Sequence, residues 1–196
     1  MTLALMDALR FEHLRSHLPA RLLLMALWVL LLVAATLVAP PAQDTQTLVW
    51  KLATFQGPDP WLDATFNLMG LWPLLYARVL WRGIGKFWWP IVAVMAGMAI
   101  GAFILLPTTA LRSFGAQPHQ DPAWVRWFTG SVWVGGVLSL FGFVLLAYGT
   151  VFGDPTVLIR WWRSDGFVFT YLCDFSALAL GFGVLLWAER AAAESQ

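Results

Sequence analysis

The chain has 196 residues, enough for one ordinary domain, but its composition is not that of a soluble one. Hydrophobic residues make up 60% of it and charged residues only 12%, whereas a soluble domain carries about a quarter charged residues. Twelve basic and eleven acidic side chains almost cancel, which gives no support to nucleic-acid binding. The single cysteine, Cys173, argues against an internal disulfide and against a thiolate metal site. We therefore expect an all-α integral membrane protein, a helical bundle covered by lipid.

The first twenty residues mix apolar and charged side chains in the pattern of an amphipathic helix. Leu9 and Leu14 belong to the apolar set, and the charged residues among them are Asp7, Arg10, Glu12 and Arg15. A helix of this kind lies along the membrane surface rather than across it. We therefore expect an interfacial segment over residues 1–20, followed by a single transmembrane domain over residues 21–190.

Five apolar segments of this domain are predicted to cross the bilayer. They are residues 22–39, 61–81, 87–106, 128–152 and 167–187. The first is uncharged, and at about 1.5 Å per residue it covers roughly 27 Å of hydrocarbon. The second is the least secure, because fourteen uncharged residues between Asp63 and Arg78 are short for a full crossing. If that segment is re-entrant, the orientation of everything after it reverses.

The basic residues of the loops predict the orientation in the membrane. With five spans, eight lie on the side of the N-terminus and four on the other: Arg10, Arg15, Arg21, Arg78, Arg82, Lys86, Arg160 and Arg163 against Lys51, Arg112, Arg126 and Arg190. Because cytoplasmic loops are enriched in Lys and Arg, we expect the N-terminus in the cytoplasm, or in the stroma of a photosynthetic membrane.

Three polar side chains inside the predicted spans require an explanation, since an aspartate at a helix centre costs about 2.5–3.5 kcal/mol on insertion. Asp174 lies seven residues into the last span and should face the bundle interior. It can carry protons or hold a polar ligand, but a hydrogen-bonded acid that ties helices together is the more frequent case. Asp63 is expected to cap the helix after Pro60. Asn67 lies four residues later and therefore on the same helix face.

No catalytic or metal-binding pattern accompanies these residues. The three histidines fall outside the spans, and neither a nucleophile motif nor a His-Glu metal helix is present, so we expect no enzymatic activity. Asparagine and aspartate oxygens can ligate the magnesium of chlorophyll, but interhelical hydrogen bonds explain Asn67 and Asp174 without a pigment. No cofactor is therefore predicted.

Two motifs in the sequence are distinctive. Residues 66–77 have the sequence Phe-Asn-Leu-Met-Gly-Leu-Trp-Pro-Leu-Leu-Tyr-Ala, and residues 171–175 have the sequence Tyr-Leu-Cys-Asp-Phe. They resemble motifs of a family of cyanobacterial and chloroplast integral membrane proteins of unknown function. The resemblance implies a multi-pass protein of a cytoplasmic or thylakoid membrane, and no known reaction. Because Asn67 and Asp174 fall within these motifs, we expect one interhelical polar contact between the second and fifth spans.

Three functions are open at this stage. The first is a non-enzymatic accessory or assembly factor that binds other proteins of photosynthetic membranes, favoured by the glycine-rich spans and tryptophan-rich span ends. The second is a small transporter or proton-coupled carrier in which Asp63, Asn67 and Asp174 line a polar pathway, and it requires a cavity that reaches Asp174. The third is a pigment- or quinone-binding protein.

Overall fold

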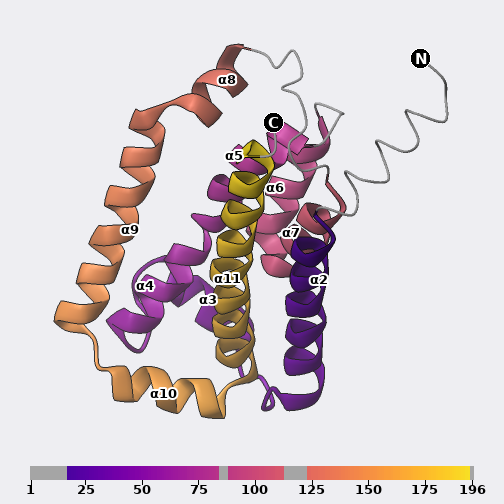
Figure 1. Cartoon of the computed structure of the whole chain (residues 1–196). Coiled ribbons are helices and arrows are strands. Elements are labelled where there is room, and N and C mark those ends of the chain that lie inside the picture. Colours follow the sequence, from indigo (N-terminus) through magenta and orange to yellow (C-terminus); the bar gives the residue numbers. More distant parts are fainter. Residues whose placement is uncertain (1–16, 84–87, 113–122, 195–196) are drawn as a thin grey trace, which may run out of the picture.

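A computed structural model describes residues 17–83, 88–112 and 123–194 of the chain as helices joined by short connections (Figure 1). No strand occurs within these ranges. The interfacial segment predicted over residues 1–20 lies outside the described residues, apart from its last four, of which residues 18–20 already belong to the first described helix.

Three helices are long and apolar enough to cross a membrane, which fits an integral membrane protein. In chain order they are α2 (Leu18–Val33) with its π-helical extension η1 (Ala34–Val38), α9 (Val132–Phe152) and α11 (Gly166–Glu194). They correspond to the spans predicted at 22–39, 128–152 and 167–187. In Figure 1, α2 and α11 stand side by side and α9 stands apart. The long helix of the fourth predicted span begins at Val132 instead of residue 128. Ser131 caps it, because its hydroxyl oxygen accepts a hydrogen bond from the Val134 amide.

The second predicted span, residues 61–81, is divided into two helices. α4 (Pro60–Met69) lies in the lower half of Figure 1, and α5 (Trp72–Gly83) lies in the upper half. Pro73 has no N–H to donate to the carbonyl four residues earlier, so a continuous helix would lose a hydrogen bond there. In the first turn of a new helix the missing N–H costs nothing.

The third predicted span, residues 87–106, is not one helix, and its first residue lies outside the described ranges. α6 (Trp88–Ile100) ends at Gly101, where φ is +55°, and α7 (Ala102–Leu111) follows. A Cβ on Gly97 would lie 2.8 Å from the Leu105 side chain, although eight residues of continuous helix extend about 12 Å. α6 and α7 therefore form a hairpin with its tip at Gly101. Glycine suits the tip because it adopts positive φ without steric cost.

The hairpin tip lies near the middle of the bundle. The Trp28 indole N–H donates to the Phe103 carbonyl over 3.0 Å, and the Ala102 amide donates to Asp174 over 2.6 Å. Trp28 is ten residues into α2, and Asp174 is eight residues into α11. At about 1.5 Å per residue, the tip is thus roughly 12–15 Å from an end of each long helix.

Four helices meet around Arg112, the residue after α7, near the ends of α5 and α11, and this is the upper end of the bundle in Figure 1. Its guanidinium donates to the Val79 carbonyl of α5 and forms an ion pair with Glu189 of α11. Its own carbonyl accepts a hydrogen bond from Arg21 in the first turn of α2. The beginning of α2 and the ends of α5, α7 and α11 therefore share one side of the molecule. α8 (Ala123–Gly130) then leads into α9.

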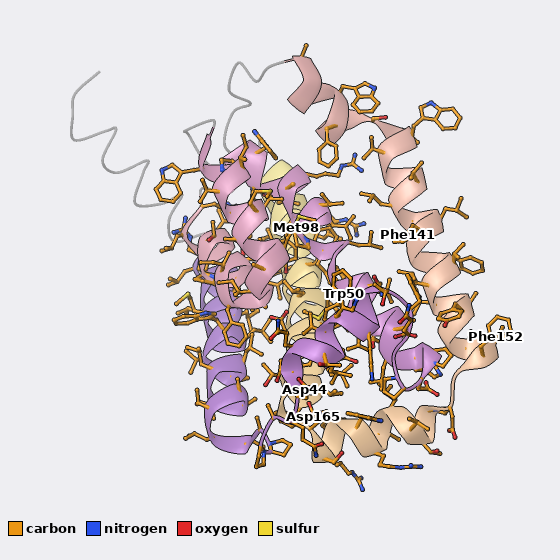
Figure 2. The ribbon with its side chains drawn as sticks, turned by 180° about the vertical axis from the view of Figure 1, so that it is seen from behind. Asp44, Trp50, Met98, Phe141, Phe152 and Asp165 are labelled. Atoms are coloured by element: carbon orange, nitrogen blue, oxygen red, sulfur yellow. The ribbon has the colours of Figure 1, made fainter. Side chains whose placement is uncertain are left out.

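The lower end is tied by Asp165, the residue before α11. Its carboxylate accepts hydrogen bonds from the amides of Gln43, Phe167 and Val168. Figure 2 shows Asp165 close to Asp44, at the beginning of α3 (Thr45–Ala53). α10 (Pro155–Ser164) lies across this end of the bundle in Figure 1, as an interfacial helix would.

The main apolar core fills the upper half of the bundle. Its fully buried side chains come from α2, α5, α7 and α11, and the largest are Leu24, Tyr76, Leu80, Leu105, Leu106, Leu178 and Leu185. The Tyr76 hydroxyl donates to the Leu178 carbonyl over 2.9 Å. The hairpin is thus packed on α2, α5 and α11 above its tip.

Substitution of Gly101 tests the hairpin. Gly101→Ala is expected to lower the free energy of unfolding by about 2 kcal/mol or more, because an L residue pays for the left-handed conformation and its Cβ would overlap the Asp174 carboxylate. Gly136→Ala is the matched control, since nothing lies within 4 Å of a Cβ there and alanine favours a helix. Unfolding in detergent followed by circular dichroism measures both. Equal stability of the two variants would contradict the hairpin.

Candidate functional site

Asp174 of α11 caps the second half of the hairpin. Its Oδ1 accepts a hydrogen bond from the Ala102 amide, the first N–H of α7. The first N–H groups of a helix have no carbonyl partner within it, and the helix dipole places partial positive charge there. The beginning of α7 therefore binds an acidic side chain in the interior of an apolar bundle.

The other carboxylate oxygen of Asp174, Oδ2, takes no part in this hydrogen bond. The residue is 2% exposed, and Oδ2 is buried without a hydrogen-bond partner among the described residues. A buried acceptor without a partner costs about 1–3 kcal/mol, and more when it carries charge. This oxygen can be satisfied by a proton, a water molecule or a ligand.

A cavity of about 460 Å³ opens beside Asp174. It lies between α4, the hairpin tip and α11, and its wall includes Phe66, Asn67, Gly101, Thr170, Tyr171 and Asp174. Its margin includes Gly70 and the exposed tip residues Met98 and Ile100. In Figure 2 Met98 lies above Trp50 of α3, on the face where the cavity opens. The cavity that the carrier hypothesis requires is therefore present.

The direct contact expected between Asn67 and Asp174 is not formed. The Asn67 amide donates to the Leu52 carbonyl over 2.8 Å and to the Asp63 carbonyl over 2.9 Å. Leu52 lies in the last turn of α3, and its carbonyl also accepts from the Phe55 amide over 3.4 Å, so Asn67 adds a second donor at this helix end. Asn67 thus ties α4 to α3, while Asp174 is occupied by Ala102. The two residues share the wall of one cavity instead of one hydrogen bond.

Asp63 has a different role from the one expected. It lies in the first turn of α4, but the cap residue is Asp59, whose Oδ1 accepts from the Trp61 amide over 2.8 Å. The Asp63 carboxylate accepts from the Gly57 amide over 3.0 Å and is 2% exposed. Asp63 therefore holds the turn that precedes α4 and does not belong to the cavity wall.

The acidic residues of the lower connections act as caps. Asp154 accepts hydrogen bonds from the hydroxyl and the amide of Thr156, and these lower the pKa of its carboxyl. Hydrogen bonds from Thr47 likewise lower the pKa of Asp44. Within the described ranges no group of three or more His, Cys, Asp and Glu residues could hold a metal ion. These acids therefore organise helix starts, and Asp174 is the acid on the wall of the cavity of about 460 Å³.

The hairpin tip supplies part of the site that sequence reasoning missed. Because α6 ends at Ile100, the carbonyls of its last turn have no following amides in the same helix, and they carry the negative end of its dipole. Met98, Ala99 and Ile100 are on the cavity wall. The sequence signal was Gly97 with Gly101, which also fits ordinary close packing of two helices.

Three aromatic rings form another part of the wall that the sequence did not single out. The centroids of Phe66 and Tyr171 lie 5.7 Å apart, and those of Phe167 and Tyr171 lie 5.5 Å apart. All three residues line the cavity. The Tyr171 hydroxyl lies 3.3 Å from the Thr65 hydroxyl, which orients its ring. The cavity thus combines one acid with an aromatic wall.

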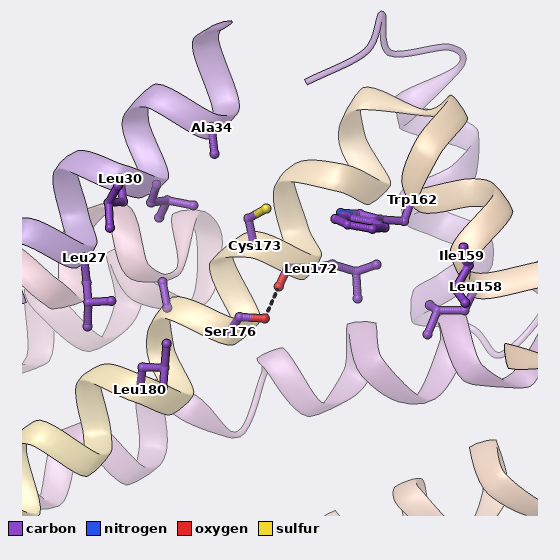
Figure 3. Close-up of a pocket in the computed structure, with 12 residues that line it drawn as sticks. Leu27, Leu30, Ala34, Leu158, Ile159, Trp162, Leu172, Cys173, Ser176 and Leu180 are labelled. Carbon is purple, nitrogen blue, oxygen red and sulfur yellow. Dashed lines mark hydrogen bonds between the residues drawn. The ribbon is translucent and has the colours of Figure 1, made fainter. Parts of the chain in front are cut away.

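A second cavity, of about 390 Å³, lies between α2, α10 and α11 (Figure 3). Leu30, Trp162 and Leu180 are among its lining residues, and none of the described residues on its wall is charged. The Ser176 hydroxyl donates to the Leu172 carbonyl over 2.9 Å and is therefore satisfied within its own helix. This cavity suits an apolar chain and offers no charged group. The cavity beside Asp174 is therefore the candidate functional site.

Comparison with protein-family models, curated proteins and solved structures finds no match to this chain.

Proposed function

We propose that the protein is a small membrane carrier whose solute site is the cavity beside Asp174. The observation that carries this proposal is Asp174, which lines a cavity of about 460 Å³ and whose buried Oδ2 has no hydrogen-bond partner among the described residues. An acid within a membrane bundle is costly, and such residues mark ion and substrate pathways. A purely structural acid would be expected to use both oxygens in hydrogen bonds.

The helix ends around the cavity support the same proposal. In secondary transporters, discontinuous helices bring backbone ends to a site near the bilayer midplane, where they bind charged groups. Here α6 and α7 meet at Gly101, roughly 12–15 Å from the ends of the long helices. Irregular backbone at such a depth is tolerated where it is buried in protein or lines a cavity. The backbone break at Gly101 meets both conditions, because it is buried in the bundle and lines the cavity.

The upper end of the bundle provides the contact that a carrier would have to release. A carrier opens its site to the two sides of the membrane in turn. Above the hairpin tip, the apolar core and the ion pair between Arg112 and Glu189 close the bundle. We propose that opening toward that side separates Arg112 from Glu189 and moves α7 relative to α11.

We also propose four crossings in place of five. α2, the α4–α5 pair, α9 and α11 cross, and the hairpin enters and leaves on one side. By backbone position, Arg21, Arg78, Arg82, Arg112, Arg126 and Arg190 then lie on or toward the side of the upper end, against Lys51, Arg160 and Arg163 on the other. This excess favours the cytoplasm or stroma as the proposed location of the upper end, with the beginning of α2 and the end of α11.

Reporter fusions before residue 17 and after residue 196 test the crossing number. Four crossings predict that both reporters are cytoplasmic, because the beginning of α2 and the end of α11 lie on the same side of the bundle. A phosphatase reporter that is inactive at both ends, with a fluorescent reporter active at both, is the expected pair of results. Opposite locations of the two ends would support five crossings and contradict the hairpin topology.

Concentration-jump currents on a solid-supported membrane test the carrier proposal. Reconstituted protein is challenged with small organic cations, organic anions and neutral solutes, each with and without a pH gradient. We expect currents with one of these classes, lost in Asp174→Asn because the site loses its charge. Asp154→Asn makes the same chemical change at an exposed cap, where Asn serves as well as Asp, and should keep them. Unchanged currents in Asp174→Asn, or none from any class, would contradict the proposal.

An accessory role in a photosynthetic membrane is the second candidate. It is favoured by α9, whose buried residues are Leu145 and Gly149 and whose outer face exposes Phe141 and Phe152 (Figure 2). Another membrane protein could pack there, and the photosynthetic membrane itself is proposed from the sequence resemblance alone. Lipid covers such a face equally well, so the carrier proposal, which rests on a polar site, takes precedence.

A further inference from the structure

We propose that the cavity beside Asp174 binds an organic ammonium ion, with the cationic nitrogen at Asp174 Oδ2 and its apolar substituents against the aromatic wall. This inference rests on the solute site of the proposed carrier and names the chemical class of its ligand.

The charge of the site selects a cation. Asp174 contributes a carboxylate, and none of the described residues on the cavity wall is Lys, Arg or His. Oδ1 is committed to the Ala102 amide, which leaves Oδ2 for the ligand. The last carbonyls of α6 add the negative end of a helix dipole at the same place. An anion would be repelled by the carboxylate and by these carbonyls, and the positive end of α7 is already paired with Oδ1.

The aromatic wall selects an organic cation over an inorganic one. Phe66, Phe167 and Tyr171 line the cavity with neighbouring centroids 5.5–6.1 Å apart. A cation within about 6 Å of a ring centroid is attracted by the ring face, and quaternary ammonium groups are recognised in this way. Calcium or magnesium would instead require six or more oxygen ligands. Ring faces serve the first class of ligand and not the second.

The volume of the cavity and its flexible methionine side chains agree with an organic cation as the ligand. Its volume of about 460 Å³ falls within the roughly 300–1,000 Å³ of small-molecule sites and far exceeds that of a single ion. Met69 and Met98 also line it, and methionine side chains adapt to ligands of different shape. Thr170 and Asn67 are polar residues of the same wall. A cation with apolar substituents of moderate size therefore fits the cavity.

Binding of benzyltrimethylammonium to the full chain in lipid nanodiscs tests the inference, with empty nanodiscs as the blank. Isothermal titration calorimetry should detect binding that 100-fold excesses of sodium ion, benzoate or neopentylbenzene do not displace. Neopentylbenzene has the same shape with carbon in place of the charged nitrogen. No saturable binding, or equal competition by neopentylbenzene, would overturn the inference.

Three variants locate the binding. Asp174→Asn should weaken it at least about tenfold, and it keeps an oxygen that can accept from Ala102. Tyr171→Leu should weaken it about three- to tenfold, while Tyr171→Phe keeps the ring and most of the affinity. Asp154→Asn should have no effect. Unchanged affinity in both Asp174→Asn and Tyr171→Leu would overturn the inference, and the second variant keeps the test valid if the first does not fold.

The two proposals fail in different ways. Saturable binding that depends on Asp174, together with the absence of solute currents, would support the ammonium site and contradict the carrier. Currents that depend on Asp174 with another class of solute, without ammonium binding, would support the carrier and overturn this inference.

Discussion

The hydrogen bond between the Ala102 amide and Asp174 is the constraint on which the rest of the structure depends. Apolar surroundings leave a helix start without water, so its free amides must find an acceptor in the protein. Asp174 is that acceptor, and the start of α7 in turn places positive partial charge beside the acid. Each group would be costly there without the other. The contact fixes the depth of the hairpin tip, and hence the position of the cavity.

Helix lengths agree with this constraint. α6 has 13 residues and α7 has 10, which at about 1.5 Å per residue gives roughly 20 Å and 15 Å. Neither reaches across a hydrocarbon core of about 30 Å. Together they enter far enough to meet Asp174 and Trp28, and then return to the side where Arg112 joins α5 and α11. The hairpin is thus anchored at both its tip and its base.

The long helices were predictable from sequence, because α2, α9 and α11 each contain an apolar stretch long enough to cross a membrane and need no partner to be recognised. The hairpin was not, since hydropathy is the same whether residues 87–106 cross the membrane or turn back within it. Only the backbone at Gly101, with φ at +55°, separates the two cases. The break between α4 and α5 at residues 70–71 had two signals in the sequence, Pro73 and the short uncharged stretch after Asp63. The four crossings are a proposal, and the photosynthetic membrane stays a prediction.

Within the site, Asp174 could be singled out because a single acid in an apolar span is costly wherever it lies. Its partner could not, because the Ala102 amide is freed only by the turn at Gly101. Asn67 was placed correctly on the face of Asp63, and it does bond the Asp63 carbonyl. Its bond to Leu52 depends on how α3 packs on α4, which helical periodicity does not encode.

Solid-state NMR of the protein in lipid bilayers tests the central claim most directly. With ¹⁵N in alanine and ¹³C in the aspartate side chains, the amide of Ala102 should show a through-space cross-peak to the carboxyl carbon of Asp174. The shifts of Gly101 should report a non-helical backbone with positive φ between two helices. A continuous helical pattern from residue 97 to residue 105 without that cross-peak would contradict the hairpin, and with it the site proposed at its tip.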